Sequence, residues 1–267
     1  MTDTTTFDET PAARAARFRT EAAARGIPAA EVEAYIRIAR PAVYLAEDGP
    51  GPVAAVTGGN PPLPEGAPTP TTAFVAAVDC ASLPPGATDL PLPAEGRLLF
   101  FADPDPGSGH VTADAVRYIP AGTPSSERPV DPDTGPVTYH RARLDLCFHQ
   151  WSWPTPEEDD DEESQREAEL ESAWSHVVGW RPHWRFQLGG HPNAFNWDPV
   201  EVAREEEPLS VAEGADGEEG DDWTLLATWR GGDDCEELES ALFHWVIPRA
   251  DLAALRFDRV YVYVDAF

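Results

Sequence analysis

Residues able to perform acid–base chemistry are concentrated in one short loop, LGGHPNAFNWD, at residues 188–198. A histidine such as His191 can act as a base or a metal ligand, and a carboxylate such as Asp198 can orient it. Gly189 and Gly190 permit backbone conformations that bring such groups close to other segments. The loop therefore has two interpretations: a catalytic or binding loop, and a structural corner.

A similar segment elsewhere in the sequence favours the interpretation of this loop as a structural corner. GGNP at residues 58–61 recurs as GGHP at residues 189–192. The copies share two glycines and a proline, which set backbone geometry, whereas Asn60 takes the place of His191 and cannot titrate. The second copy adds His191, Trp197 and Asp198. The candidate residues for a ligand or partner loop are Gly58, Gly59, Asn60, Gly189, Gly190, His191, Trp197 and Asp198.

Motifs for other chemistry are lacking in the sequence. Its histidines show no metal-ligand spacing, and no phosphate-binding, dinucleotide-binding or nucleophile-elbow motif occurs. DPDPGSGH, residues 103–110, weakly resembles a calcium loop but lacks the spaced glutamate. We therefore expect no metal and no cofactor, and no catalytic residue is assigned.

Acidic charge is concentrated in local segments. The net charge is −29, and runs of carboxylates fall in the loops expected at residues 155–163 and 201–222. Because nucleic-acid binding needs clustered basic charge, we expect no nucleic-acid partner. Three interpretations of the acidic runs stay open: solvated loops, weak capture of divalent cations, and attraction of a basic protein partner.

Compartment is indicated by three further features. No apolar run is long enough to span a bilayer, and residues 1–10, which we expect to be disordered, show no secretory signal. Cys80, Cys147 and Cys235 form no CxxC pair, so neither a disulfide framework nor a zinc knuckle is expected. These features predict a cytoplasmic protein without membrane contact.

Apolar patterning predicts an α+β protein, mainly antiparallel. Helices are expected at residues 11–25, 28–39, 162–178 (capped by Gly179) and 249–255. Strands are expected at residues 42–45, 74–78, 97–102, 115–119, 139–148, 184–188, 223–230, 241–247 and 260–264. The glycine- and proline-rich residues 49–70 are expected to hold no long regular element. The order predicts a single domain over residues 11–267, with two duplicated β-rich halves at residues 41–136 and 137–267 packed as one unit.

Tryptophan is confined to the second half of the sequence, and its nine copies have two interpretations. Those on alternating strands are most simply core residues. Others lie in expected loops, where they could line a groove for a peptide or small ligand: Trp151, Trp153, Trp180 and Trp197.

Five segments resemble, in the same order, the YwqG-like bacterial proteins, a family of domains of unknown function. They are TGGNPPLPEG, AFVAAVDCASLP, LPAEGRLLFFAD, FQLGGHPNAFNWD and ALFHWVIPRADLAALRFDRVYVYV, and the resemblance covers residues 35–265. It implies a cytoplasmic α+β protein with a duplicated core and transfers no catalytic residue. Trp197 stands where the family usually has glutamine, and TWRGGDDCEELESA replaces a tryptophan-glycine-aspartate turn. The resemblance therefore supports no ligand role at these two places.

Two functional hypotheses follow. The first is a non-enzymatic binding or interaction protein with an acidic surface, for example one that neutralises a basic partner such as a toxin. The alternative is an enzyme with a site between the two halves, which uses His191 with Asp198 or with Arg185.

Overall fold

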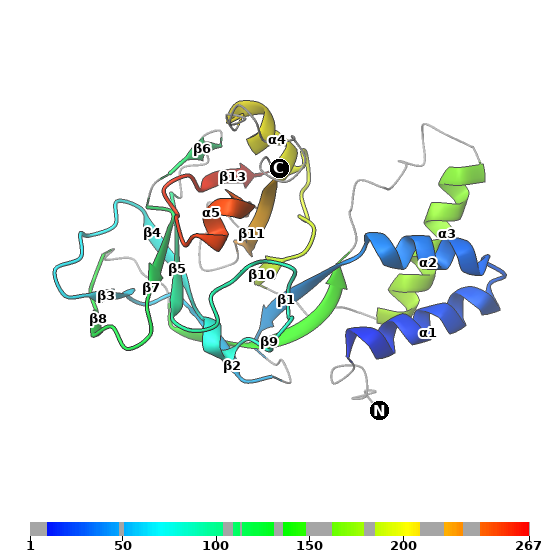
Figure 1. Ribbon diagram of the computed structural model, residues 1–267, viewed down its shortest axis with the longest axis horizontal. Helices are drawn as coiled ribbons and strands as arrows, with labels where there is room; N and C mark the ends of the chain where they lie inside the picture. The colour runs from blue at the N-terminus through cyan, green and yellow to red at the C-terminus, as the bar shows by residue number, and fades with distance from the viewer. Residues whose placement is uncertain are drawn as a thin grey trace.

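The protein combines one large, curled antiparallel sheet with a separate group of helices (Figure 1). The computed structural model describes residues 10–47, 51–103, 109–112, 114–130, 136–147, 162–178, 185–208, 222–231 and 241–266. The helices are α1 (Pro11–Ala24), α2 (Ala29–Ile38), α3 (Glu162–Val178), α4 (Pro199–Glu206) and α5 (Arg249–Ala253). The strands are β1 (Arg40–Ala46), β2 (Val53–Thr57), β3 (Pro62–Pro64), β4 (Ala73–Asp79), β5 (Arg97–Ala102), β6 (His110–Val111), β7 (Val116–Ile119), β8 (Ser125–Glu127), β9 (Thr138–Cys147), β10 (Phe186–Gly189), β11 (Trp223–Arg230), β12 (Leu242–Pro248) and β13 (Tyr261–Asp265). The predicted α+β class is confirmed. In the described ranges, no helix is long and apolar enough to cross a membrane.

Eleven strands form the main sheet in the order β6-β13-β12-β11-β10-β1-β9-β2-β4-β5-β7, and β3 and β8 form a separate pair. β1 and β9 pair with each other at its centre. β1 also pairs with β10, which leads into the second glycine loop, and β9 also pairs with β2, which leads into the first. Each expected half therefore places its first strand beside a strand of the other half.

The main core lies inside the curl of the sheet. Phe100, Phe186 and Trp245 are fully buried there. The ring centroid of Phe100 lies 4.9 Å from that of Phe186 and 5.3 Å from that of Trp245. The indole Nε1 of Trp245 donates a hydrogen bond to the carbonyl oxygen of Phe101 at 3.0 Å. This bond links β12 to β5 across the core.

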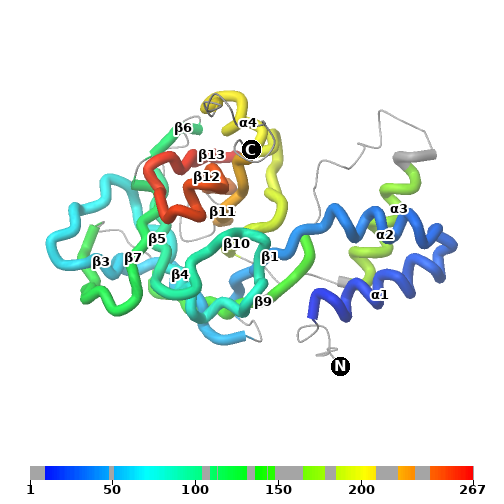
Figure 2. Tube along the Cα trace, in the orientation of Figure 1, coloured from blue at the N-terminus to red at the C-terminus, as the bar shows by residue number. Residues whose placement is uncertain are grey.

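A second, smaller core joins α1, α2 and α3 to one side of the sheet (Figure 2). The ring of Phe18 packs edge-on against Trp174, with centroids 5.4 Å apart, and also contacts Tyr35. A buried ion pair between Arg14 of α1 and Asp145 of β9 ties the helices to the sheet. Because a buried charge without its partner is costly, this pair fixes α1 on β9.

Several predicted elements are confirmed by the structure. α3 has the predicted bounds, and its apolar stripe of Leu170, Trp174 and Val177 is buried. β11 and β12 are antiparallel neighbours, as predicted. The disorder expected for residues 1–10 does not hold at Thr10, the one described residue of this segment, because its Oγ1 accepts a hydrogen bond from the backbone N–H of Ala13 and caps α1.

Other expectations need correction. Residues 51–70 hold no long element, but they contain two short strands, β2 and β3, that the composition did not indicate; β2 forms because β9 and β4 supply hydrogen-bonding edges on both sides of it. α4 was not predicted, and Pro28 precedes α2 as its N-cap instead of lying in its first turn. β10 is buried on both faces, not half-buried, since Gln187 is as inaccessible as Phe186 and Leu188. Some features of the sequence lie outside the described residues: residues 1–9, Trp151, Trp153, residues 157–161, Gly179, Trp180, Trp184, residues 209–221 and Cys235.

Candidate functional site

The second glycine loop is held by hydrogen bonds from its own strand and from β9. The Nε2 of Gln187 donates to the carbonyl oxygens of Gly189 and His191, each at 2.8 Å. The thiol of Cys147 donates to the same His191 oxygen at 3.3 Å. These bonds use backbone acceptors that a turn would otherwise leave unsatisfied, so they fix the exit of β10.

His191 and Asp198 serve two different elements. The Nε2 of His191 lies 2.8 Å from the carbonyl oxygen of Ile38, at the end of α2. The Oδ1 of Asp198 accepts from the backbone N–H of Val200 at 2.7 Å and caps α4. An aspartate at this position satisfies free N–H groups of the first turn. Both side chains therefore have a structural role in positioning the chain.

Both glycine pairs adopt the left-handed backbone that favours glycine. The φ angles are 68° at Gly58 and Gly59, 64° at Gly189 and 76° at Gly190. A Cβ atom at Gly190 would lie 2.8 Å from the Cβ of Ala42, and one at Gly59 would lie 2.6 Å from the Cγ2 of Val137. The two loops thus share a corner whose backbone conformation requires glycine.

Asp265 fixes the last part of the second loop. Its carboxylate, 1% exposed, accepts hydrogen bonds from the backbone N–H groups of Phe195 and Asn196 and from the Asn196 side-chain amide. Trp197 follows directly and is 68% exposed, while Asp198 after it caps α4. Both neighbours of this tryptophan are therefore anchored, and its ring is presented to solvent from a fixed backbone.

The helix after Trp197 carries an acidic outer face. Glu201 and Glu205 are exposed on this face of α4, and Glu207, the C-cap residue that follows the helix, is exposed as well. Arg204 offsets one of them through a 2.5 Å ion pair with Glu201. The opposite face packs through Ala203 onto an apolar cluster of the sheet. The exposed tryptophan and the exposed glutamates thus lie on one continuous stretch of chain.

A row of buried polar side chains crosses the sheet beneath this loop. Gln187, Thr228 and His244 face one another on neighbouring strands and are fully buried. The Thr228 hydroxyl lies 2.9 Å from Nδ1 of His244. Burial is the main influence on this imidazole and lowers its pKa to about 4, against the opposing charges of Asp265 and Asp198. Sequence alternation indicated the polar positions, but not that they are buried.

A groove of about 300 Å³ opens beside the first glycine loop. Gly58 and Asn60, both predicted candidates, line it. Its rim carries three exposed apolar side chains, Val53 (39%), Val137 (51%) and Tyr139 (61%). The remaining polar side chains of the lining are Asp79, Arg97 and Glu127. Sequence reasoning missed Tyr139 and Arg97 because only the strand register brings them to the same groove.

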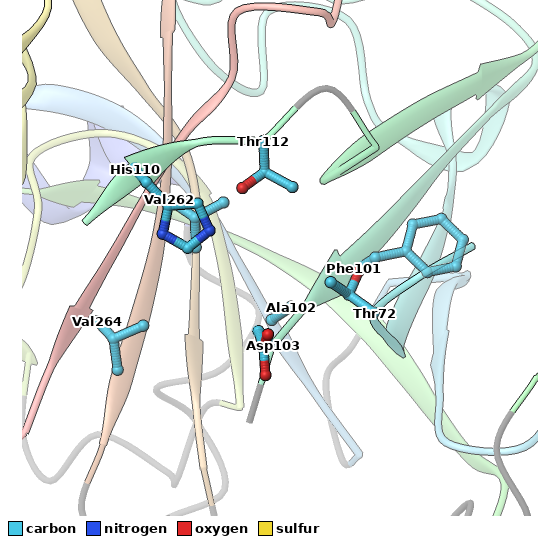
Figure 3. Close-up of a pocket in the computed structure, with 8 residues that line it drawn as sticks. All are labelled: Thr72, Phe101, Ala102, Asp103, His110, Thr112, Val262 and Val264. Carbon is cyan, nitrogen blue, oxygen red and sulfur yellow. The ribbon is translucent and has the colours of Figure 1, made fainter. Parts of the chain in front are cut away.

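A smaller pocket marks the seam where β5 approaches β6 and β13 (Figure 3). Asp103, His110 and Thr112 line it together with Val262 and Val264. Its volume of about 10 Å³ suits a single water molecule and excludes an organic substrate. Among the described side chains, no cluster of three or more histidines, cysteines or acids could hold a metal ion.

Comparison with known proteins identifies the family to which the chain belongs. A search of curated proteins finds no match to the chain. A family model described as a domain of unknown function, DUF1963, matches residues 56–266. The match includes both glycine loops, Trp197 and the strands of the sheet that follow β2, while β1 lies outside it. The chain therefore belongs to the DUF1963 family of domains of unknown function.

Proposed function

We propose that the protein is a non-enzymatic interaction protein that binds a basic partner protein. The binding surface, here named the Trp197–α4 surface, consists of Trp197, Glu201, Glu205 and Glu207. The observation that carries the proposal is the 68% exposure of Trp197 between two anchored neighbours. A tryptophan on a fixed backbone loses little conformational freedom on binding, and buried tryptophans dominate the energy of many interfaces.

The charge of the chain supports a basic partner. With a net charge of −29, the protein attracts cationic surfaces over long range, which raises the rate of association. Salt weakens this attraction because it screens exposed charges. The exposed glutamates beside Trp197 supply the local part of the same field.

The proposal also includes a cytoplasmic location and an internal duplication of the chain. The buried free thiol of Cys80 favours a reducing compartment, in agreement with a cytoplasmic location. The first strand of each half pairs with a strand of the other half: β1 pairs with β10, and β9 pairs with β2. This symmetric pairing favours an internal duplication, and the YwqG-like resemblance implies one as well. An enzyme that uses His191 and Asp198 has less support, because each side chain holds a different structural element.

The test compares two exposed aromatic side chains. Wild-type protein, Trp197→Ala and Tyr139→Ala are immobilised and incubated with native lysate at low and high salt. Tyr139, 61% exposed, is the matched control because it lines the groove beside the first glycine loop and is not part of the Trp197–α4 surface. We expect one stoichiometric basic protein on the wild type and on Tyr139→Ala, absent from Trp197→Ala and released by salt.

Affinity for the purified partner makes the test quantitative. Truncation of a central interface tryptophan typically costs about 2 kcal/mol or more, which corresponds to a weakening of about 30-fold. Calorimetry with the three proteins measures this difference. Equal affinity of the wild type and Trp197→Ala, or binding that salt does not change, would overturn the proposal.

A further inference from the structure

We propose that the groove beside the first glycine loop binds a small amphiphilic carboxylate, with the carboxylate at Arg97 and the apolar body directed toward Tyr139. This site is separate from the Trp197–α4 surface, so neither proposal depends on the other. It rests on the strand register, on the charges that line the groove and on the exposed apolar rim.

The register places the charged and the apolar ends far apart on one face of the sheet. Tyr139 of β9 lies opposite Val56 of β2, and Val56 lies opposite Ala77 of β4. Asp79, two residues beyond Ala77, lies opposite Arg97 of β5. From the usual strand spacing and rise per residue, the Cα atoms of Arg97 and Tyr139 are about 15 Å apart. Val56 and Ala77 provide an apolar floor between them.

Arg97 is the cation in this groove that is available to a ligand. The carboxylate of Asp79, its direct neighbour, already accepts from the N–H of Ala81 at 3.2 Å and from the hydroxyl of Ser82 at 2.9 Å. The backbone of Arg97 pairs with β4 and β7, but within the described part of the chain its guanidinium has no hydrogen bond or ion pair. Other arginines are paired with carboxylates: Arg14, Arg19, Arg25, Arg117, Arg166, Arg204, Arg256 and Arg259.

An unpaired arginine is notable because the chain holds 48 acidic residues against 19 basic ones. A guanidinium binds a carboxylate through two parallel hydrogen bonds, which is the strongest charge-assisted geometry available to it. A ligand anion at Arg97 therefore gains a partner that the protein itself does not supply.

The far end of the groove favours an apolar group. Val53, Val137 and Tyr139 form an exposed apolar rim, and the volume of about 300 Å³ lies at the lower end of the range for small-molecule sites. Asp79 and Glu127, the latter on β8 opposite Pro62, add two negative charges to the lining, so an acidic head is favoured only in direct contact with the Arg97 guanidinium. The groove thus selects one acidic head and one apolar tail.

The test uses decanoate as the probe, below its micellar concentration, with the full chain. Calorimetry measures the affinity, and amide chemical shifts report the location. We expect saturable binding of decanoate with shifts at Gly58, Asn60 and Tyr139, and at least tenfold weaker binding of decanol and decyltrimethylammonium. These two probes keep the tail and change only the head, so they test the charge without any substitution.

Variants test the same two ends. Arg97→Met should weaken decanoate binding at least tenfold and leave decanol binding unchanged. Arg37→Met is the matched control, because Arg37 is an exposed arginine on α2, away from the groove, and should have no effect. Ala77→Trp should fill the groove and abolish binding of the ten-carbon probes. The proposal is overturned if the wild type fails to bind decanoate, if the cationic probe binds as tightly, or if Arg97→Met binds decanoate normally.

Discussion

Gly190 and Gly66 offer a direct test of why the second glycine loop needs glycine. Both have a φ of +76°. A Cβ at Gly190 would lie 2.8 Å from the Cβ of Ala42 and 2.9 Å from the Cβ of Cys147, whereas a Cβ at Gly66 would meet nothing within 4 Å. Alanine at the two positions therefore imposes the same backbone strain in two different environments.

The difference between the two variants measures close packing. A non-glycine residue in left-handed backbone costs roughly 1–2 kcal/mol, and this contribution applies to Gly66→Ala and Gly190→Ala alike. The lower entropy of the unfolded chain with alanine is also common to both and cancels. Overpacking at Gly190 adds roughly 1–3 kcal/mol, because the nearest atoms belong to two paired strands and cannot move separately. We expect a loss of about 1–2 kcal/mol for Gly66→Ala and about 2–5 kcal/mol for Gly190→Ala.

Gly59→Ala adds an intermediate case to the series. Its φ is +68°, and the nearest atom is the Cγ2 of Val137 at 2.6 Å. Val137 is 51% exposed, so its side chain can rotate away and the cost should approach that of Gly66→Ala. Urea denaturation followed by tryptophan fluorescence measures all three free energies of unfolding. Equal losses for Gly66→Ala and Gly190→Ala, with unchanged m-values, would refute the interpretation of the loop as a tightly packed corner.

Three further changes test the buried groups. The pKa of His244 is lowered from 6.5 to about 4, so the unfolded chain binds a proton that the folded protein does not, and stability should fall by about 3 kcal/mol as the pH drops from 6.5 to 4. His244→Asn should remove this part of the pH dependence in urea denaturation, and an unchanged slope contradicts it. Arg14→Met should cost about 3–5 kcal/mol in thermal unfolding because Asp145 stays buried without this partner. The double variant Arg14→Met/Asp145→Leu should be more stable than Arg14→Met, and the reverse order counts against the reasoning. Burial raises the pKa of the Cys80 thiol to about 12, so about one part in ten thousand is thiolate at pH 8. Iodoacetamide should therefore modify Cys80 only as the protein unfolds, and rapid labelling of the native protein argues the opposite.

Elements with strong local patterns could be predicted from the sequence. The stripe of Leu170, Trp174 and Val177 identifies α3, and alternation of apolar and polar residues identifies β11 and β12. Burial of one face of an element makes its apolar residues recur with the period of that element. The residues of β2 show no such periodic pattern. Its residues become a strand because β9 and β4 pair with both of its edges, and this long-range interaction has no local signature.

The candidate residues show the same limit. The sequence located both glycine loops and indicated that their shared content is backbone geometry, in agreement with the positive φ angles. It could not assign His191 to the end of α2 or Asp198 to the start of α4, because both partners depend on how distant elements meet. The sequence also could not show that Arg97 and Tyr139 line one groove, because three strand pairings bring them there.

One difference between the two corners explains why the sheet is open beside one loop and filled beside the other. Two residues before the first glycine of each pair stand Val56 and Gln187. Val56 lies between Tyr139 and Ala77, while Gln187 lies between Tyr44 and Thr228, so the two settings match in register.

Side-chain size then decides the outcome in each setting. The small side chains beside the first loop leave Tyr139 61% exposed over a groove, whereas Gln187 turns back to bond its own loop and Tyr44 is 5% exposed. The same backbone corner thus borders an open groove where its neighbours are small and a packed support where they are large. In the second half, the exposed surface lies farther along the chain, at Trp197.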